Sequence, residues 1–100
     1  MLSKLVLSLA LLAAAGSTKS DSLPKPGGYG FNWLAPETAE CREVTAKDIA
    51  SMKSCTDSPN AFGIDLPSKA CKVDKKVEII VYDTREHCQE GLETMQSNAP

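Results

Sequence analysis

The single histidine of the chain stands directly beside one of its four cysteines, at His87 and Cys88. Histidine and cysteine are frequent metal ligands, and an adjacent base can activate a thiolate nucleophile. The pair therefore raises two chemical possibilities, a metal site or a reactive thiol. Neighbouring residues on a helix do not face each other, and a metal would need further ligands from elsewhere in the chain. We expect the cysteine to be a structural staple and His87 to be only its neighbour.

The cysteine spacing favours disulfides over a metal or redox site. About thirteen, fifteen and sixteen residues separate Cys41, Cys55, Cys71 and Cys88, so the C-x-x-C step of zinc and thioredoxin-like sites is missing. An even cysteine count in a small exported chain predicts two disulfides. We favour Cys55 with Cys71, which flank one loop, and Cys41 with Cys88. The rival hypothesis keeps the cysteines free and uses them with His87 in an envelope metal-binding or thiol-redox protein.

The N-terminus has the pattern of a leader for export. Lys4 precedes the apolar run LVLSLALLAAA, which ends in small residues. The run is shorter than the roughly twenty residues that span a membrane, so it predicts a signal peptide over residues 1–15. Residues 16–30 are rich in Ser, Lys, Pro and Gly, which predicts a flexible leader. We expect a secreted or periplasmic protein with no stable membrane insertion after cleavage.

Composition and motifs argue against several classes of function. The formal net charge is −2 and lysines are scattered among the acids, whereas a nucleic-acid partner would call for a basic patch. The chain has no G-x-S-x-G motif and no glycine-rich phosphate loop. Glu86, Glu90 and Glu93 follow helical spacing and predict a solvated face. We expect no enzyme activity, no cofactor and no metal, which leaves another protein as the candidate partner.

Periodicity predicts one α+β domain over residues 31–100, with two helices on a short sheet of two to three strands. The expected order is β-α-β-β-α, with extended pieces at residues 41–44 and 71–73, a strand at 77–82, and helices at 46–54 and 84–97. The strand should be central, because apolar side chains point to both of its faces.

Capping patterns define the two predicted helices. Thr45 suits an N-cap, and Ile49, Met52 and Cys55 fall on one face, so the first helix should end by delivering Cys55 to the core. For the second helix, Asp83 and Glu86 form a predicted capping box, which would place His87 against Tyr82 as a hydrophobic staple. Its inward face should carry Cys88, Leu92 and Met95, with Gly91 leaving room for the disulfide.

Two segments are candidate binding surfaces. The stretch GYGFNWLAP gathers Tyr29, Phe31 and Trp33, which could cover the central strand as core or form an exposed aromatic anchor. The loop over residues 56–70 carries Phe62, Ile64 and Leu66 between two prolines, and could present them as in a secreted inhibitor or toxin. The predicted function is therefore a small exported, disulfide-bonded module that acts by binding or as a structural part.

Overall fold

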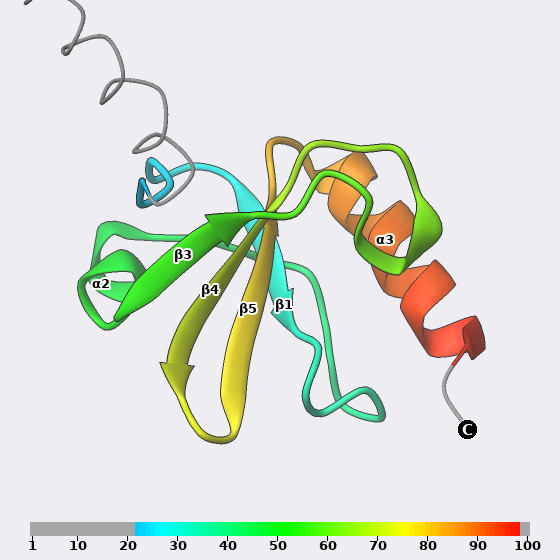
Figure 1. Cartoon of the computed structure of the whole chain (residues 1–100), viewed down its shortest axis with the longest axis horizontal. Helices are drawn as coiled ribbons and strands as arrows, with labels where there is room; N and C mark the ends of the chain where they lie inside the picture. Colours follow the sequence, from blue (N-terminus) through cyan, green and yellow to red (C-terminus); the bar gives the residue numbers. More distant parts are fainter. Residues whose placement is uncertain (1–21, 99–100) are drawn as a thin grey trace, which may run out of the picture.

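The computed structural model describes residues 22–98, so the predicted signal peptide and part of the predicted leader lie outside the described residues. One antiparallel sheet of five strands in the order β2-β1-β5-β4-β3 carries the long helix α3 against one face (Figure 1). The elements are β1 (Tyr29–Asn32), β2 (Arg42–Glu43), α2 (Ala46–Ala50), β3 (Ser54–Asp57), the 3-10 turn η3 (Ala61–Gly63), β4 (Lys69–Asp74), β5 (Val77–Tyr82) and α3 (Arg85–Asn98).

The two consecutive strands predicted around residues 71–73 and 77–82 form a hairpin, and the predicted central position of the second is confirmed. β4 and β5 pair antiparallel, and β5 lies in the middle of the sheet with β1 on its other side. Alternate residues of β5 serve two separate cores: Ile80 packs with α3, and Val81 packs on the opposite face. Both faces of β5 carry apolar residues because each face packs in a core.

The sheet is wider than the predicted two to three strands, because β1 and β3 extend it on both sides. β1 begins at Tyr29, so the last two residues of the stretch expected to be a flexible leader belong to a strand. The glycines there serve close packing: a Cβ on Gly30 would lie 2.7 Å from the carbonyl oxygen of Ile80. Glycine lets β1 approach β5 at a distance that a side chain would prevent.

The first helix is shorter than predicted, and Cys55 lies on a strand. α2 ends at Ala50, and Lys53 already donates its N–H to the Lys72 carbonyl at 2.7 Å. The following residues form the edge strand β3, which pairs with β4 in a register that sets Cys55 opposite Cys71. Pairing with a distant strand thus overrides the local helical spacing, although Met52 and Cys55 still reach the same core.

The start of α2 follows its predicted capping pattern. The Asp48 N–H donates to the Thr45 hydroxyl at 3.2 Å, and the Thr45 N–H donates to Asp48 Oδ2 at 2.8 Å. The bond from the Thr45 N–H, and then the one from its hydroxyl, hold the pKa of Asp48 below its ordinary value. This carboxylate should therefore stabilise the fold above about pH 4, with the contribution lost as the pH falls through the folded-state pKa.

The Asp48→Asn substitution is expected to lower the free energy of unfolding by about 0.5 kcal/mol at neutral pH, within the range for lost helix caps. The difference from wild type should vanish in acid, where Asp48 is protonated in both states. Urea unfolding at several pH values measures it. Asp65→Asn, at an exposed carboxylate beyond η3, is the control. An equal effect of Asp48→Asn at all pH values would mean that the ionised cap is not the cause.

The second helix begins one residue later than predicted. Thr84 is its N-cap, since the His87 N–H donates to the Thr84 hydroxyl at 3.1 Å and the Cys88 N–H to the Thr84 carbonyl at 3.0 Å. The capping box of Asp83 with Glu86 is therefore wrong. The inward face is confirmed: Cys88, Gly91, Leu92 and Met95 are buried. Gly91, however, makes room for Tyr82, whose hydroxyl would clash with a Cβ at that position.

Candidate functional site

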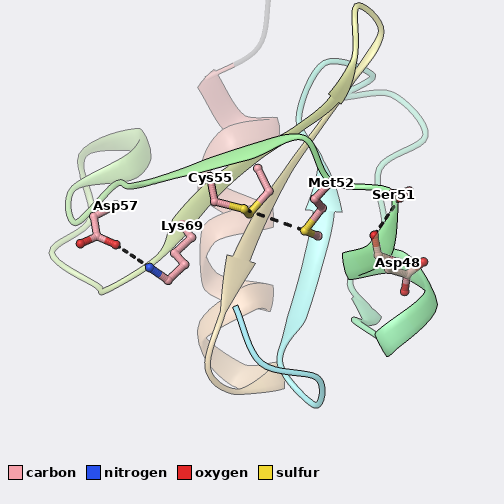
Figure 2. The surroundings of a disulfide bond; sticks show 7 residues. Asp48, Ser51, Met52, Cys55, Asp57 and Lys69 are labelled. Atoms are coloured by element: carbon pink, nitrogen blue, oxygen red, sulfur yellow. Dashed lines mark hydrogen bonds and ion pairs between the residues drawn. A yellow bond between two sulfur atoms is a disulfide. The ribbon is translucent and has the colours of Figure 1, made fainter. Parts of the chain in front are cut away.

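The four cysteines form two disulfides, Cys41–Cys88 and Cys55–Cys71, which is the pairing favoured from the sequence. The first ties the segment between β1 and β2 to α3, with Cα atoms 6.1 Å apart. The second crosses from β3 to β4, where Figure 2 shows it beside the Met52 sulfur, 4.0 Å from Cys55 Sγ. Each face of the sheet thus has a small core containing one disulfide.

The disulfides answer the question raised by the adjacent histidine and cysteine. Cys88 is fully buried and bonded to Cys41, so its sulfur carries no thiol. The hypothesis of free cysteines acting with His87 is contradicted, because all four cysteines lie within residues 22–98 and none is free. In the same part of the chain, no group of three or more His, Cys, Asp or Glu side chains is arranged to hold a metal ion.

His87 interacts with an acid at the start of α3. Its Nδ1 lies 2.6 Å from Asp83 Oδ1, and this hydrogen bond holds the pKa of Asp83 below its ordinary value. The predicted staple with Tyr82 is wrong, because the Tyr82 ring turns into the core and stacks on Phe31 with ring centroids 6.3 Å apart. Asp83 and His87 together form an exposed pair at the edge of the domain.

The two predicted binding segments pack on each other. Phe31 is buried, and its ring lies 6.0 Å from that of Phe62 in the loop. Trp33 meets the same Phe62 ring edge-on at 6.2 Å and donates its Nε1–H to Glu78 Oε1 at 2.9 Å. Phe31 is therefore a core residue. Trp33 and Phe62 are half-buried at the margin of the core.

The loop between β3 and β4 folds back against the domain. Its neck is closed by the Ser58 N–H bond to the Ser68 carbonyl, 2.8 Å, and by the ion pair of Lys69 with Asp57, also 2.8 Å. Beyond the neck, Leu66 packs against the core on the α3 side, and Ile64 is half-buried. Tyr29 of β1 is half-buried against the same core. Phe62 holds a positive φ of 59°, a backbone conformation that costs about 1–2 kcal/mol outside glycine and is retained here by ring packing.

Two open hollows, neither anticipated from the sequence, contain the exposed large hydrophobic side chains of residues 22–98, Leu23 and Leu34. The proline cleft, about 700 Å³, is lined by residues 22–28, 57, 67–69 and 81–83. The lysine hollow, about 480 Å³, is lined by Leu34, Lys53, Ser54, Lys72, Val73, Asp74, Lys75 and Glu78.

The lysine hollow lies across three strands. Ser54, Lys72 and Glu78 are successive partners in the register, so they form one row on the sheet. This is the face that bears α3, because Glu78 alternates in phase with Ile80, which packs in the α3 core. Leu34 reaches the same hollow from the segment after β1 and is 41% exposed.

The charges of the lysine hollow do not cancel. Three lysines, Lys53, Lys72 and Lys75, line it against two acids, Asp74 and Glu78, and none of the five forms an ion pair within the described part of the chain. Glu78 accepts a hydrogen bond from Trp33 Nε1, and Asp74 accepts one from the Lys76 N–H at 2.8 Å. The hollow therefore offers a ligand positive charge around an exposed apolar side chain.

The opposite face of the sheet has two smaller hollows, of about 200 and 350 Å³, which share Gly30, Arg42, Val77 and Ile79. Asp48 lines the smaller one, and Arg42 is among the charges that lower the pKa of Asp48. Glu43 lines this hollow as well, so two acids face one cation. Its net charge is therefore negative, in contrast to that of the lysine hollow.

Comparison of the chain with protein-family models, with curated proteins and with solved structures finds no match. Among residues 22–98, no helix is both long and apolar enough to cross a membrane. Two disulfides in so small a domain point to an oxidising compartment outside the cytoplasm. The chain is thus a small extracellular, disulfide-stabilised α+β protein.

Proposed function

We propose that this protein is a secreted or periplasmic binding module without catalytic activity, and that it docks an acidic segment of a partner protein in the lysine hollow. The observation that carries the proposal is the combination of exposed Leu34 with three lysines that have no ion pair in residues 22–98. One exposed leucine alone would mean little, since exposed apolar atoms are common on protein surfaces.

Charge complementarity supports an acidic peptide as the occupant. The positive charge is local, because the whole chain has a formal net charge of −2 and α3 exposes Glu86, Glu90 and Glu93. A long polyanion would meet these acids as well as the lysines, whereas a short acidic segment can contact the lysines alone. An apolar residue within that segment would cover Leu34, which otherwise remains in water.

The folded hairpin gives this surface a fixed shape. Lys72 and Glu78 stand on paired strands, and the Cys55–Cys71 disulfide closes the neighbouring β3–β4 pair. A preformed site loses little conformational entropy on binding, so modest contacts can produce measurable affinity. The loop closed by Cys55–Cys71 does not need to act as a projecting inhibitor loop, because Phe62 and Leu66 pack on the core.

Fluorescence of Trp33, the only tryptophan, provides the test. Its indole is bonded to Glu78, which lines the hollow, so docking should change its emission. A synthetic peptide of alternating acidic residues with one central leucine is expected to bind with an affinity that falls as salt rises. The same peptide with Asn and Gln in place of the acids should bind far more weakly.

Charge reversal then locates the site. Lys53→Glu should weaken binding of the acidic peptide about tenfold, because it removes one attraction and adds one repulsion, each worth up to about 1 kcal/mol. Lys47→Glu is the matched control, an exposed lysine on α2 outside the hollow. Equal binding by both variants would contradict the proposal. So would a single-stranded oligonucleotide that binds as tightly as the acidic peptide.

A further inference from the structure

The proline cleft has the size and construction of a small-molecule site. Ligand pockets measure about 300–1,000 Å³, and this cleft measures about 700 Å³. Its floor is the end of the sheet, where Val81 and Tyr82 of β5 lie beside Lys69 of β4. The cleft and the lysine hollow share no lining residue.

One wall of the cleft is the segment that precedes β1. It is fixed to the domain at its base, where the Gly27 N–H donates to the Val44 carbonyl at 2.9 Å and the Val44 N–H donates to the Gly28 carbonyl at 2.8 Å. Pro24 and Pro26 restrict the backbone of this wall, since a proline ring fixes φ. A wall that is already restricted loses less entropy when a ligand is bound.

The apolar surface of the cleft is not covered by the domain itself. Leu23 lines the cleft and is 48% exposed, although leucine is a residue that folding normally buries. Pro67 from the loop and Val81 from β5 add apolar surface to that of the proline wall. An apolar molecule in the cleft would remove this surface from water.

The charged residues that line the cleft indicate which polar group a ligand should carry. Asp57 forms an ion pair with Lys69 at 2.8 Å, and Asp83 shares a hydrogen bond with His87 at 2.6 Å. Lys25 lines the same cleft and has no ion pair among residues 22–98. The one charge that the cleft can offer without breaking an internal pair is therefore positive.

From this geometry we propose that the proline cleft binds a small amphipathic carboxylate. Its apolar chain lies against Leu23, Pro67 and Val81, and its carboxylate pairs with the ammonium group of Lys25. The occupant is a single soluble molecule, because the cleft is a hollow bounded on one side by the anchored segment and not a flat surface for a lipid bilayer. This binding is independent of peptide docking in the lysine hollow.

Titration of the ¹⁵N-labelled protein with dodecanoate, kept below its micelle concentration, tests the proposal. Amide shifts are expected to move at residues 23, 25, 27, 28, 68, 69 and 81–83, with saturation at one equivalent, and to stay unchanged at Lys53 and Lys72. Lys25→Gln should weaken binding about three- to fivefold, as expected for loss of one exposed ion pair. Lys47→Gln is the matched control at an exposed lysine elsewhere.

Three results would overturn the inference. If the cation dodecyltrimethylammonium bound as tightly as dodecanoate, pairing of a carboxylate with Lys25 would not be the basis of binding. Equal affinities for Lys25→Gln and Lys47→Gln would do the same, provided both variants keep the wild-type amide spectrum without ligand. Binding to phosphatidylglycerol vesicles in preference to monomeric dodecanoate would replace the small molecule by a membrane surface. Because the variants and the reporting amides differ from those of the lysine hollow, either proposal can fail without the other.

Discussion

Replacing Cys41 and Cys88 together with alanine is expected to lower the free energy of unfolding by about 4 kcal/mol in the chain-entropy model of disulfide stabilisation. The two cysteines are 47 residues apart in the sequence, so their bond restricts a long stretch of the unfolded chain. Small domains are stable by about 5–15 kcal/mol in total. The loss is therefore a large share of the total, and this variant should unfold at a much lower urea concentration than wild type.

The second disulfide provides the internal comparison. Cys55 and Cys71 are 16 residues apart, which gives about 3 kcal/mol in the same model. Urea unfolding followed by circular dichroism should thus rank the Cys41–Cys88 double variant below the Cys55–Cys71 double variant. The opposite ranking would show that local packing around Met52, and not loop length, determines how much each bond contributes. Wild type treated with a reducing agent should be less stable than either variant, because it lacks both bonds.

Gly91→Ala is expected to destabilise the protein by about 2 kcal/mol. Alanine is favoured over glycine in a helix by about 1 kcal/mol, but forced overpacking of a core costs about 1–3 kcal/mol, occasionally more. The steric term should prevail here because the new Cβ would overlap the Tyr82 hydroxyl, and the ring atom Cε1 would lie only 2.9 Å away. Thermal unfolding measures the effect, with Ser97→Ala on the exposed side of α3 as the control for helix propensity.

The partner substitution Tyr82→Phe separates the clash from other effects. The Tyr82 hydroxyl is buried and has no hydrogen-bond partner within residues 22–98, so removing it should stabilise the protein by about 1 kcal/mol. In the double variant, Tyr82→Phe should relieve only part of the Gly91→Ala penalty, since ring atoms remain close to the new methyl group. Strictly additive effects would mean that the two positions do not interact.

Alkaline pH offers a second readout on Tyr82. Burial, and then the negative charge of Glu90, raise the pKa of its hydroxyl above the ordinary value. The folded state therefore holds this proton more tightly than the unfolded state. The stability that results is present below about pH 10 and is lost as the pH rises through the folded-state pKa. Tyr82→Phe should remove this part of the alkaline transition.

The hairpin and α3 could be predicted because their signals are local. β5 carries β-branched residues on both faces, and α3 repeats its buried positions at helical spacing from Cys88 to Met95. The strands that were missed depend on partners far along the chain. β3 has the polar sequence Ser-Cys-Thr-Asp and becomes a strand through pairing with β4, while the glycines of β1 resemble a linker until β5 is placed beside them.

The candidate sites were harder to predict than the fold. Trp33 and Phe62 were recognised as separate aromatic features, but only the fold shows that they contact each other. The lysine hollow draws on four separate segments, and its positive character comes from three lysines against two acids. A signal existed in the close spacing of Lys72, Lys75 and Lys76, although the net charge of the whole chain hides it. No pattern along the sequence shows whether a lysine will lie next to an acid in the folded protein.

The bond between Cys41 and Cys88 has a consequence for survival among extracellular proteases. Any single cut of the backbone between these residues leaves Cys41 on one fragment and Cys88 on the other, so the pieces remain one covalent molecule. A cut in the loop between β3 and β4 leaves the pieces joined by Cys55–Cys71 as well. A nicked domain therefore does not dissociate, and its strands can stay paired across the break. Both hollows can thus outlast the first cleavage between β2 and α3.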